Sequence, residues 1–116
     1  MHEFALAQNI VKAIEENTGE DFQNLTAIHI EVGEFAGVVQ DSLLFGLEVC
    51  LKDKQLENIQ IHFTHVPGKA LCSCQHQYEL KDMFEACPKC HTYQRKIISG
   101  TDVLIKSVEV KDSPTH

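Results

Sequence analysis

Four of the chain's five cysteines fall into two short pairs, and this spacing limits how the surrounding segment can fold. The pairs are Cys72-Ser73-Cys74 and Cys87-Pro88-Lys89-Cys90, with twelve residues between them. Four thiolates arranged in this way are typical of a tetrahedral structural zinc site, in which two tight turns present two sulfurs each. A segment of roughly 25 residues with few large apolar side chains needs such a staple, because its own core is too small to hold it.

Two features leave alternatives open for this segment. The first pair is one residue shorter than the usual Cys-x-x-Cys, so His76 and His91 are alternative zinc ligands. A disulfide pair or scattered reduced thiols are competing interpretations. The N-terminus lacks the basic and apolar regions of a secretion signal, which predicts a cytoplasmic protein whose thiols stay reduced. A closed shell of four sulfurs has no open position for a substrate, so the metal is expected to be structural.

The rest of the chain predicts two helices and three strands. Apolar residues recur at helical spacing over residues 3–16 and 43–51. They alternate, as in strands, over residues 25–32, 59–63 and 103–110. Cys50 lies on the apolar face of the second helix and is expected to be a buried small hydrophobe.

The order of these elements predicts an α+β fold class. Helix, strand, helix, strand, insert and strand are most simply arranged as two helices packed on a three-stranded mixed sheet, with an inserted zinc-ribbon-like subdomain. The predicted organisation is an α/β domain of residues 1–66 and 99–116, interrupted by a zinc-binding subdomain of residues 67–98.

Composition excludes several function classes. The net charge of −7, without any basic cluster, argues against a nucleic-acid partner. No apolar run approaches the length of a membrane span. The sequence shows no nucleophile beside a base, no phosphate-binding glycine loop and no usefully spaced acids, so an enzyme is not expected. His29, His62 and His65 lie on predicted strands, where surface or boundary positions are favoured over a ligand role.

The first three residues, Met1-His2-Glu3, can form a chelate at the terminus. The α-amine, the backbone nitrogen of residue 2 and the His2 imidazole close two fused rings around one ion, a donor set that suits Ni(II) or Cu(II). Glu3 adds a carboxylate nearby, and the competing interpretation is an accidental histidine at a frayed terminus. Asp41 reaches this metal only if its loop packs beside Met1, and Asp41 or Ser42 is expected to cap the second helix.

Taken together, the chain resembles the HypA/HybF family of hydrogenase-maturation nickel chaperones over nearly its full length. The resemblance rests on four features: the Met-His-Glu start, the strand end Val32-Gly33-Glu34-Phe35, the cysteine segment ending Cys87-Pro88-Lys89-Cys90-His91, and the closing strand Ile105-Lys106-Ser107-Val108-Glu109-Val110.

The resemblance implies two metal sites. Nickel is held by the terminal amine of Met1, backbone nitrogens and His2, with support from Glu3. Structural zinc sits on four cysteines, Cys72, Cys74, Cys87 and Cys90. Many members carry an acid in the loop before the second helix, where this chain has Val39. Asp41 is assigned to the nickel site only because it is the acid nearest to that position.

The resemblance also implies partners. Ni(II) is delivered to a [NiFe]-hydrogenase large subunit with the help of the GTPase HypB, and some members also serve urease maturation. Both monomers and homodimers occur in the family, which leaves the oligomeric state open. The alternative functions are a zinc-ribbon adaptor that binds proteins without delivering metal, and a small redox protein that uses the cysteine pairs.

Overall fold

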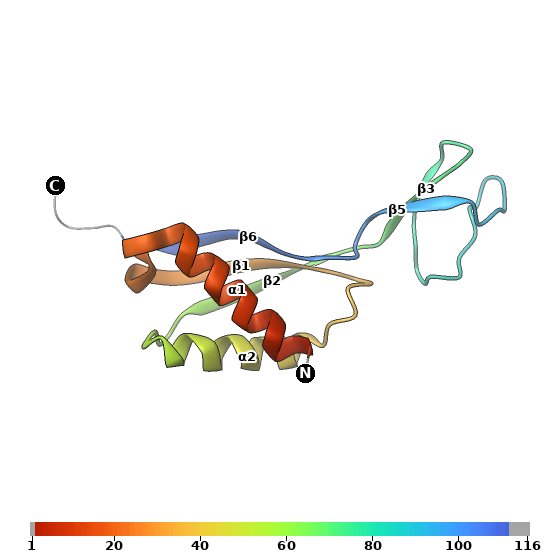
Figure 1. Ribbon diagram of the computed structural model, residues 1–116. Coiled ribbons are helices and arrows are strands. Elements are labelled where there is room, and N and C mark those ends of the chain that lie inside the picture. Colours follow the sequence, from red (N-terminus) through yellow and green to blue (C-terminus); the bar gives the residue numbers. More distant parts are fainter. Residues whose placement is uncertain (1, 112–116) are drawn as a thin grey trace. The chain divides into compact units, whose positions relative to one another are not determined.

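The structure, a computed structural model, describes residues 2–111 and, for His2, only the backbone. The chain divides into two compact units, whose elements are shown in Figure 1. The helical unit comprises Met1–Ile30, Val38–Phe63 and Leu104–His116, and the cysteine unit comprises Glu31–Gly37 and Thr64–Val103. The boundaries predicted from the sequence, at residues 66–67 and 98–99, stay a prediction. Within residues 2–111, no helix is long and apolar enough to cross a membrane.

Two helices and the larger part of a three-stranded sheet form the helical unit, and this architecture confirms the predicted fold class. The elements, in chain order, are α1 (His2–Thr18), the 3-10 helix η1 (Gly19–Asn24), β1 (Leu25–Gly33), α2 (Gln40–Asp53), β2 (Gln60–Val66) and β6 (Val103–Val110). The strand order in the sheet is β2-β1-β6. The sequence pattern predicted each of these except η1.

The sheet is mixed, as predicted. The Lys111 N–H donates to the Asn24 carbonyl and the Gly33 N–H to the Asp102 carbonyl, so β1 and β6 are antiparallel. By contrast, β1 and β2 are joined through α2, a crossover that makes neighbouring strands parallel.

Apolar residues of both helices and of β1 form the core of the helical unit. Four of its large side chains, Ile28, Ile30, Leu43 and Leu47, are completely buried. Helix α2 can approach α1 closely because it carries a glycine at the contact: a Cβ on Gly46 would lie 3.1 Å from that of Ala7. The periodicity that predicted these elements therefore reflects real burial, and η1 adds the buried Phe22.

The cysteine unit contains a second, smaller sheet that the sequence did not predict. Its strands are β3 (Lys69–Cys72), β4 (Gln77–Glu79) and β5 (Arg95–Ser99), in the antiparallel order β4-β3-β5. The hydrophobic core cluster of this unit is small and consists of five buried residues, Ala70, Cys72, Tyr78, Leu80 and Cys87. Two of the five are cysteines of the predicted zinc site, so packing and metal ligation share the same side chains.

Two expectations for α2 were wrong. The helix begins at Gln40, and its N-cap is Val39 in an extended conformation without a side-chain cap hydrogen bond. Neither Asp41 nor Ser42 therefore caps it, and Asp41 lies in the first turn. Cys50 is half-buried rather than buried. Burial, and secondarily the charge of Asp53, raises the pKa of its thiol.

Three glycines of the cysteine unit pack closely against one another or against neighbouring side chains. A Cβ on Gly33 would lie 2.3 Å from the carbonyl carbon of Gly100, and one on Gly100 would lie 2.5 Å from Cα of Gly68. A Cβ on Gly68 would in turn meet the ring of Phe35 at 2.2 Å. Phe35 also donates its N–H to the Gly100 carbonyl at 2.7 Å. A larger residue at Gly33 or Gly100 would collide with backbone, and one at Gly68 would collide with the Phe35 ring, so the junction favours glycine.

We predict that Gly100→Ala destabilises the protein more than Gly37→Ala. Both glycines have positive φ, +89° and +71°, so both variants place a non-glycine residue in the left-handed region. Only Gly100→Ala also inserts a methyl group into packed backbone, because nothing lies within 4 Å of a Cβ at Gly37. Overpacking of this kind costs about 1–3 kcal/mol. Urea titrations of the zinc-loaded variants measure the difference, and equal unfolding free energies would contradict the packing argument.

Candidate metal centre

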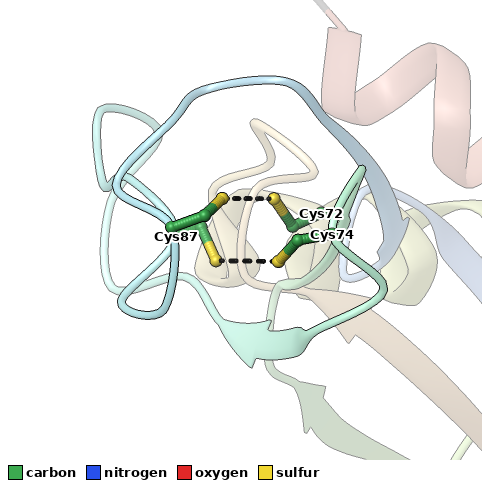
Figure 2. A group of neighbouring side chains, drawn as sticks. Cys72, Cys74 and Cys87 are labelled. Atoms are coloured by element: carbon green, nitrogen blue, oxygen red, sulfur yellow. Dashed lines mark hydrogen bonds between the residues drawn. The ribbon is translucent and has the colours of Figure 1, made fainter.

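The four predicted zinc ligands meet at one point in the cysteine unit (Figure 2). All four Sγ atoms lie within 4.8 Å of one another. The closest pairs join the two turns: Cys72 to Cys90 at 3.2 Å, and Cys74 to Cys87 at 3.8 Å. Zinc–sulfur bonds of about 2.3 Å in a tetrahedron separate the sulfurs by about 3.8 Å. The spacing therefore fits a structural zinc ion, and it is far from the S–S bond length of about 2.05 Å in a disulfide.

The turn that holds the second pair is closed by backbone hydrogen bonds around Cys87. The Cys87 N–H donates to the Thr92 carbonyl at 3.0 Å, and the His91 N–H donates to the Cys87 carbonyl at 2.8 Å. The Lys89 N–H points at the Cys87 sulfur, at 3.4 Å. His91 completes the turn in a left-handed conformation, with φ of 62°. The loop thus directs both backbone and sulfur toward the centre.

The first turn repeats this pattern one residue shorter. The Cys72 N–H donates to the His76 carbonyl and the Gln75 N–H to the Cys72 carbonyl, both at 2.9 Å. Gln75 adopts the left-handed conformation, with φ of 77°, as His91 does in the other turn. Each of these two backbone hydrogen bonds spans one residue fewer than the corresponding bond in the second turn. The missing residue of Cys72-Ser73-Cys74 is therefore absorbed by a tighter turn, and both sulfurs still reach the centre.

Hydrogen bonds give the sulfurs unequal acidities. Two hydrogen bonds are the main reasons that the pKa of Cys72 is lowered to about 6. The larger contribution comes from the Cys74 backbone and the next from the Cys90 thiol. The Thr92 hydroxyl is the main reason that the pKa of Cys90 is also lowered. The backbone of His76 lowers the pKa of Cys74, but burial and the neighbouring sulfurs outweigh it and raise that pKa to about 11. Crowded thiolates repel one another, so full ionisation of the group requires a cation.

Thr92 is a part of the site that the sequence pattern missed. Its hydroxyl lies 3.2 Å from the Cys90 sulfur and 3.7 Å from that of Cys72. A thiolate accepts hydrogen bonds, so the hydroxyl can donate to either sulfur once they are ionised. The only signal in the sequence is a threonine two residues after the last cysteine, and hydroxyl residues are too common in turns for this to stand out.

The two histidines considered as alternative ligands lie outside the group of sulfur atoms. The His76 ring stacks on Tyr78, with ring centroids 6.2 Å apart and planes 9° apart. His91 contributes the exposed left-handed residue of the second turn. The described ligand group consists of the four cysteines.

The predicted nickel residues are placed in part. Met1 lies outside the described residues, and His2 begins α1 without a described side chain. Glu3 Oε2 accepts a hydrogen bond from the Val39 N–H at 3.1 Å, which ties the start of α1 to the residue that precedes α2. Asp41 follows two residues later, in the first turn of α2.

Glu34, which belongs to the strand-end motif of the family resemblance, makes structural contacts. Its Oε1 accepts a hydrogen bond from the Gly68 N–H at 3.1 Å. Its own N–H donates to the Val66 carbonyl at 2.8 Å. Glu34 therefore fastens two chain segments at the glycine junction.

Comparison with known proteins identifies one matching family model, described as hydrogenase/urease nickel incorporation, metallochaperone, HypA, over residues 1–110. A relative from Geobacter metallireducens, named hydrogenase maturation factor HypA, is 32% identical over 112 residues, which cover 96% of this chain and 100% of the relative. A protein of the same name from Actinobacillus succinogenes is 35% identical over 113 residues, with the same two shares covered.

Two solved structures share the fold. The solution structure of the Ni metallochaperone HypA from Helicobacter pylori has a TM-score of 0.70 at 15% identity, covering 93% of this chain and 96% of that chain. A solution structure of a HypA protein has a TM-score of 0.71 at 17% identity, covering 96% and 97%.

We predict that removing the metal unfolds the cysteine unit. Its buried core is five residues, whereas zinc binding supplies on the order of 10 kcal/mol to such a unit. In NMR spectra, strong chelation should collapse the amide dispersion of Leu71 and Lys96 and leave that of Ile28 and Ile30, and zinc should restore it. Cys87→Ser should lose the zinc, whereas Cys50→Ser, which changes a cysteine outside the group, should keep one zinc per chain. Retained dispersion after complete metal removal would contradict the dependence on metal.

A second prediction concerns the Thr92 hydroxyl. Thr92→Val keeps the shape of the side chain but removes the hydrogen-bond donor. Losing an outer hydrogen bond to a metal ligand typically lowers metal affinity about 10–100-fold, and we expect this variant to lie near the lower value, at about 10-fold. Competition with a chromophoric chelator measures the zinc affinity. Thr101→Val, at an exposed threonine of the same unit, is the control and should leave the affinity unchanged.

Proposed function

Because this chain belongs to the HypA family of hydrogenase and urease nickel-incorporation metallochaperones, we propose that it carries Ni(II) and delivers it to a [NiFe]-hydrogenase large subunit. The match of the family model over nearly the whole chain is the observation that carries this proposal. A four-sulfur centre suited to structural zinc is consistent with it. Urease is a second proposed recipient, through its maturation proteins.

In this proposal nickel is bound at the free N-terminus. The α-amine of Met1, backbone nitrogens and the His2 imidazole supply the nitrogen-rich set that Ni(II) favours in a planar geometry. Glu3 lies one residue further along α1 and is held against the Val39 N–H, so its carboxylate stays close to the start of the helix. A planar ion leaves both faces open to an incoming ligand, which suits release by ligand exchange.

Asp41 is the further acid proposed at this site. Because the N-cap residue of α2 is Val39, helix capping does not account for the presence of Asp41. The hydrogen bond between Glu3 and Val39 brings the start of α1 to the residue two positions before Asp41. A carboxylate there can add an oxygen ligand or orient the His2 ring.

The zinc site has a different role in this proposal. Cys72, Cys74, Cys87 and Cys90 are the proposed ligands, and His76 or His91 is the alternative if a sulfur is displaced. When bound, zinc cross-links the two turns and supplies no reactive position. The cysteine unit then serves as a rigid surface for partners, which include the GTPase HypB. The protein acts as a monomer or homodimer in this scheme.

The competing function is a zinc-ribbon adaptor that binds proteins without delivering metal. One observation favours it: Phe84 is 84% exposed. Its loop is held by two hydrogen bonds, from the Phe84 N–H to Asp82 Oδ1 at 2.8 Å and from the Lys81 N–H to Glu85 Oε1 at 2.7 Å. An ordered loop that presents an aromatic ring to solvent suits a protein contact. Nickel binding separates the two functions.

We predict that the zinc-loaded protein with a free N-terminus binds Ni(II) tightly at one site per chain. Isothermal titration of His2→Ala, and of a chain extended by a few residues ahead of Met1, should show affinity reduced by at least about tenfold, or about 1.4 kcal/mol. Asp41→Asn should weaken binding less than His2→Ala does, because it removes no nitrogen ligand. His65→Ala, which removes an exposed strand histidine, should have no effect.

The decisive result is the behaviour of the two terminal changes. Unchanged nickel affinity in both His2→Ala and the extended chain would remove the N-terminal site and favour the adaptor. In cells, His2→Ala should leave the hydrogenase immature unless excess nickel is supplied. Rescue by nickel would assign the defect to metal delivery rather than to partner binding.

A further inference from the structure

Three polar side chains line up across the sheet of the helical unit. His62 belongs to β2, His29 to the central β1, and Glu109 to β6, which are neighbours in that order. His29 alternates with Ile28 and Ile30, which are buried in the core under the helices. Because successive strand residues point to opposite faces, His29 projects from the other face of the sheet. His62 and Glu109 are exposed.

The three side chains are in direct contact. The rings of His29 and His62 are stacked, with centroids 4.8 Å apart and planes 15° apart. His29 Nε2 lies 2.6 Å from Glu109 Oε2. His62 Nε2 lies 3.3 Å from Gln60 Oε1 on the same strand.

These contacts determine which ring nitrogens carry protons in the neutral imidazoles. An ionised carboxylate only accepts hydrogen bonds, so His29 Nε2 must be the donor to Glu109. The amide oxygen of Gln60 is likewise an acceptor, so His62 Nε2 is the donor there. Each neutral ring then has its lone pair on Nδ1. Two adjacent imidazoles, each with the same nitrogen available, are a ligand pair for a metal ion.

We propose that His29 and His62 form a second metal site, which binds a first-row divalent cation through their Nδ1 atoms, with water completing the shell. Imidazole nitrogen suits Ni(II), Cu(II) and Zn(II). Glu109 is a positioning residue: a carboxylate bonded to the far nitrogen of a histidine fixes the tautomer and raises the basicity of the ligating nitrogen. The site is distinct from the proposed N-terminal site, and it goes beyond the proposed function.

The fold holds Glu109 in place before any ion arrives. The Thr26 hydroxyl donates to the Glu109 carbonyl at 3.1 Å, and the Lys111 N–H donates to the Asn24 carbonyl at 2.8 Å, so β6 is fixed at Glu109 and again two residues beyond it. Side chains that are already ordered lose less entropy on binding.

The rings must still tilt toward each other to share an ion. Metal–nitrogen bonds of about 2.0–2.1 Å place neighbouring ligand atoms roughly 3 Å apart, whereas the centroids of the stacked rings are 4.8 Å apart. The His29 side chain is 31% exposed and His62 is exposed, so both rings border solvent, where this movement takes place. Two imidazoles and water make a weaker site than a terminal chelate. A weak site on the same protein is suited to taking up Ni(II) and giving it up again.

Nickel binding in a background without the N-terminal site tests the proposal. The full chain without a polyhistidine tag, loaded with zinc and carrying His2→Ala, should bind one Ni(II) in equilibrium dialysis. Adding His29→Ala or His62→Ala should lower that affinity at least about tenfold, and adding Glu109→Gln should lower it by up to about tenfold. Adding His65→Ala is the matched control and should change nothing.

A spectroscopic readout separates metal binding from a structural role. Cu(II) bound to the His2→Ala protein should show two equivalent imidazole nitrogens in its EPR spectrum, and one after His62→Ala. Because His62 is exposed, this variant should fold normally, which circular dichroism checks. Equal Ni(II) affinity in His2→Ala with and without His62→Ala would overturn the proposal, leaving the cluster as a brace across the sheet. The N-terminal site is judged separately, in the His29→Ala/His62→Ala protein with His2 intact.

Discussion

The convergence of four sulfurs is the constraint on which the cysteine unit depends. Two of its five buried core residues, Cys72 and Cys87, are themselves members of the sulfur group. Strand β3 ends at Cys72, opposite Arg95 of β5, so the first sulfur sits where the small sheet gives way to the first turn. Burial of so few apolar residues cannot offset the entropy of ordering the segment. The hydrogen-bonded turns, the short strands and the metal ligands are therefore one cooperative structure.

The helical unit is stabilised in a different way from the cysteine unit, and this difference bears on the two proposed metal sites. Its stability comes from burial of residues such as Ile28, Ile30 and Leu47 between helices and sheet, which needs no ion. The proposed nickel residues at the start of α1 therefore need not contribute to the stability of the fold. A terminal site can bind and release its ion while the core stays intact. The sulfur group could not release its ion in this way, because two of its members are also part of the core.

The sequence predicted the helical unit far better than the cysteine unit, for a physical reason. Long amphipathic elements repeat their pattern, so α1, β1 and α2 were visible in the spacing of apolar residues. Strands of three to five residues, such as β4 and β5, show too little alternation to be recognised. Contacts made between distant segments were also invisible: the glycine junction of Gly33, Gly68 and Gly100, and the Thr92 hydroxyl beside two sulfurs. Asp41 was misassigned as a cap because propensity favoured it, whereas the chain enters α2 through an extended Val39.

A chain with thiolate and imidazole ligands must keep its cargo ion away from its structural ion. Affinity alone does not achieve this, because Ni(II) and Zn(II) both bind nitrogen and sulfur ligands. Geometry can: the four sulfurs lie within 4.8 Å of one another, a spacing that suits tetrahedral zinc, whereas Ni(II) with nitrogen ligands favours a planar arrangement. The stacked His29 and His62 rings offer two nitrogens and an open shell, which cannot compete with four thiolates for zinc. In the proposed scheme, the number, softness and arrangement of the ligands direct each ion to its own unit.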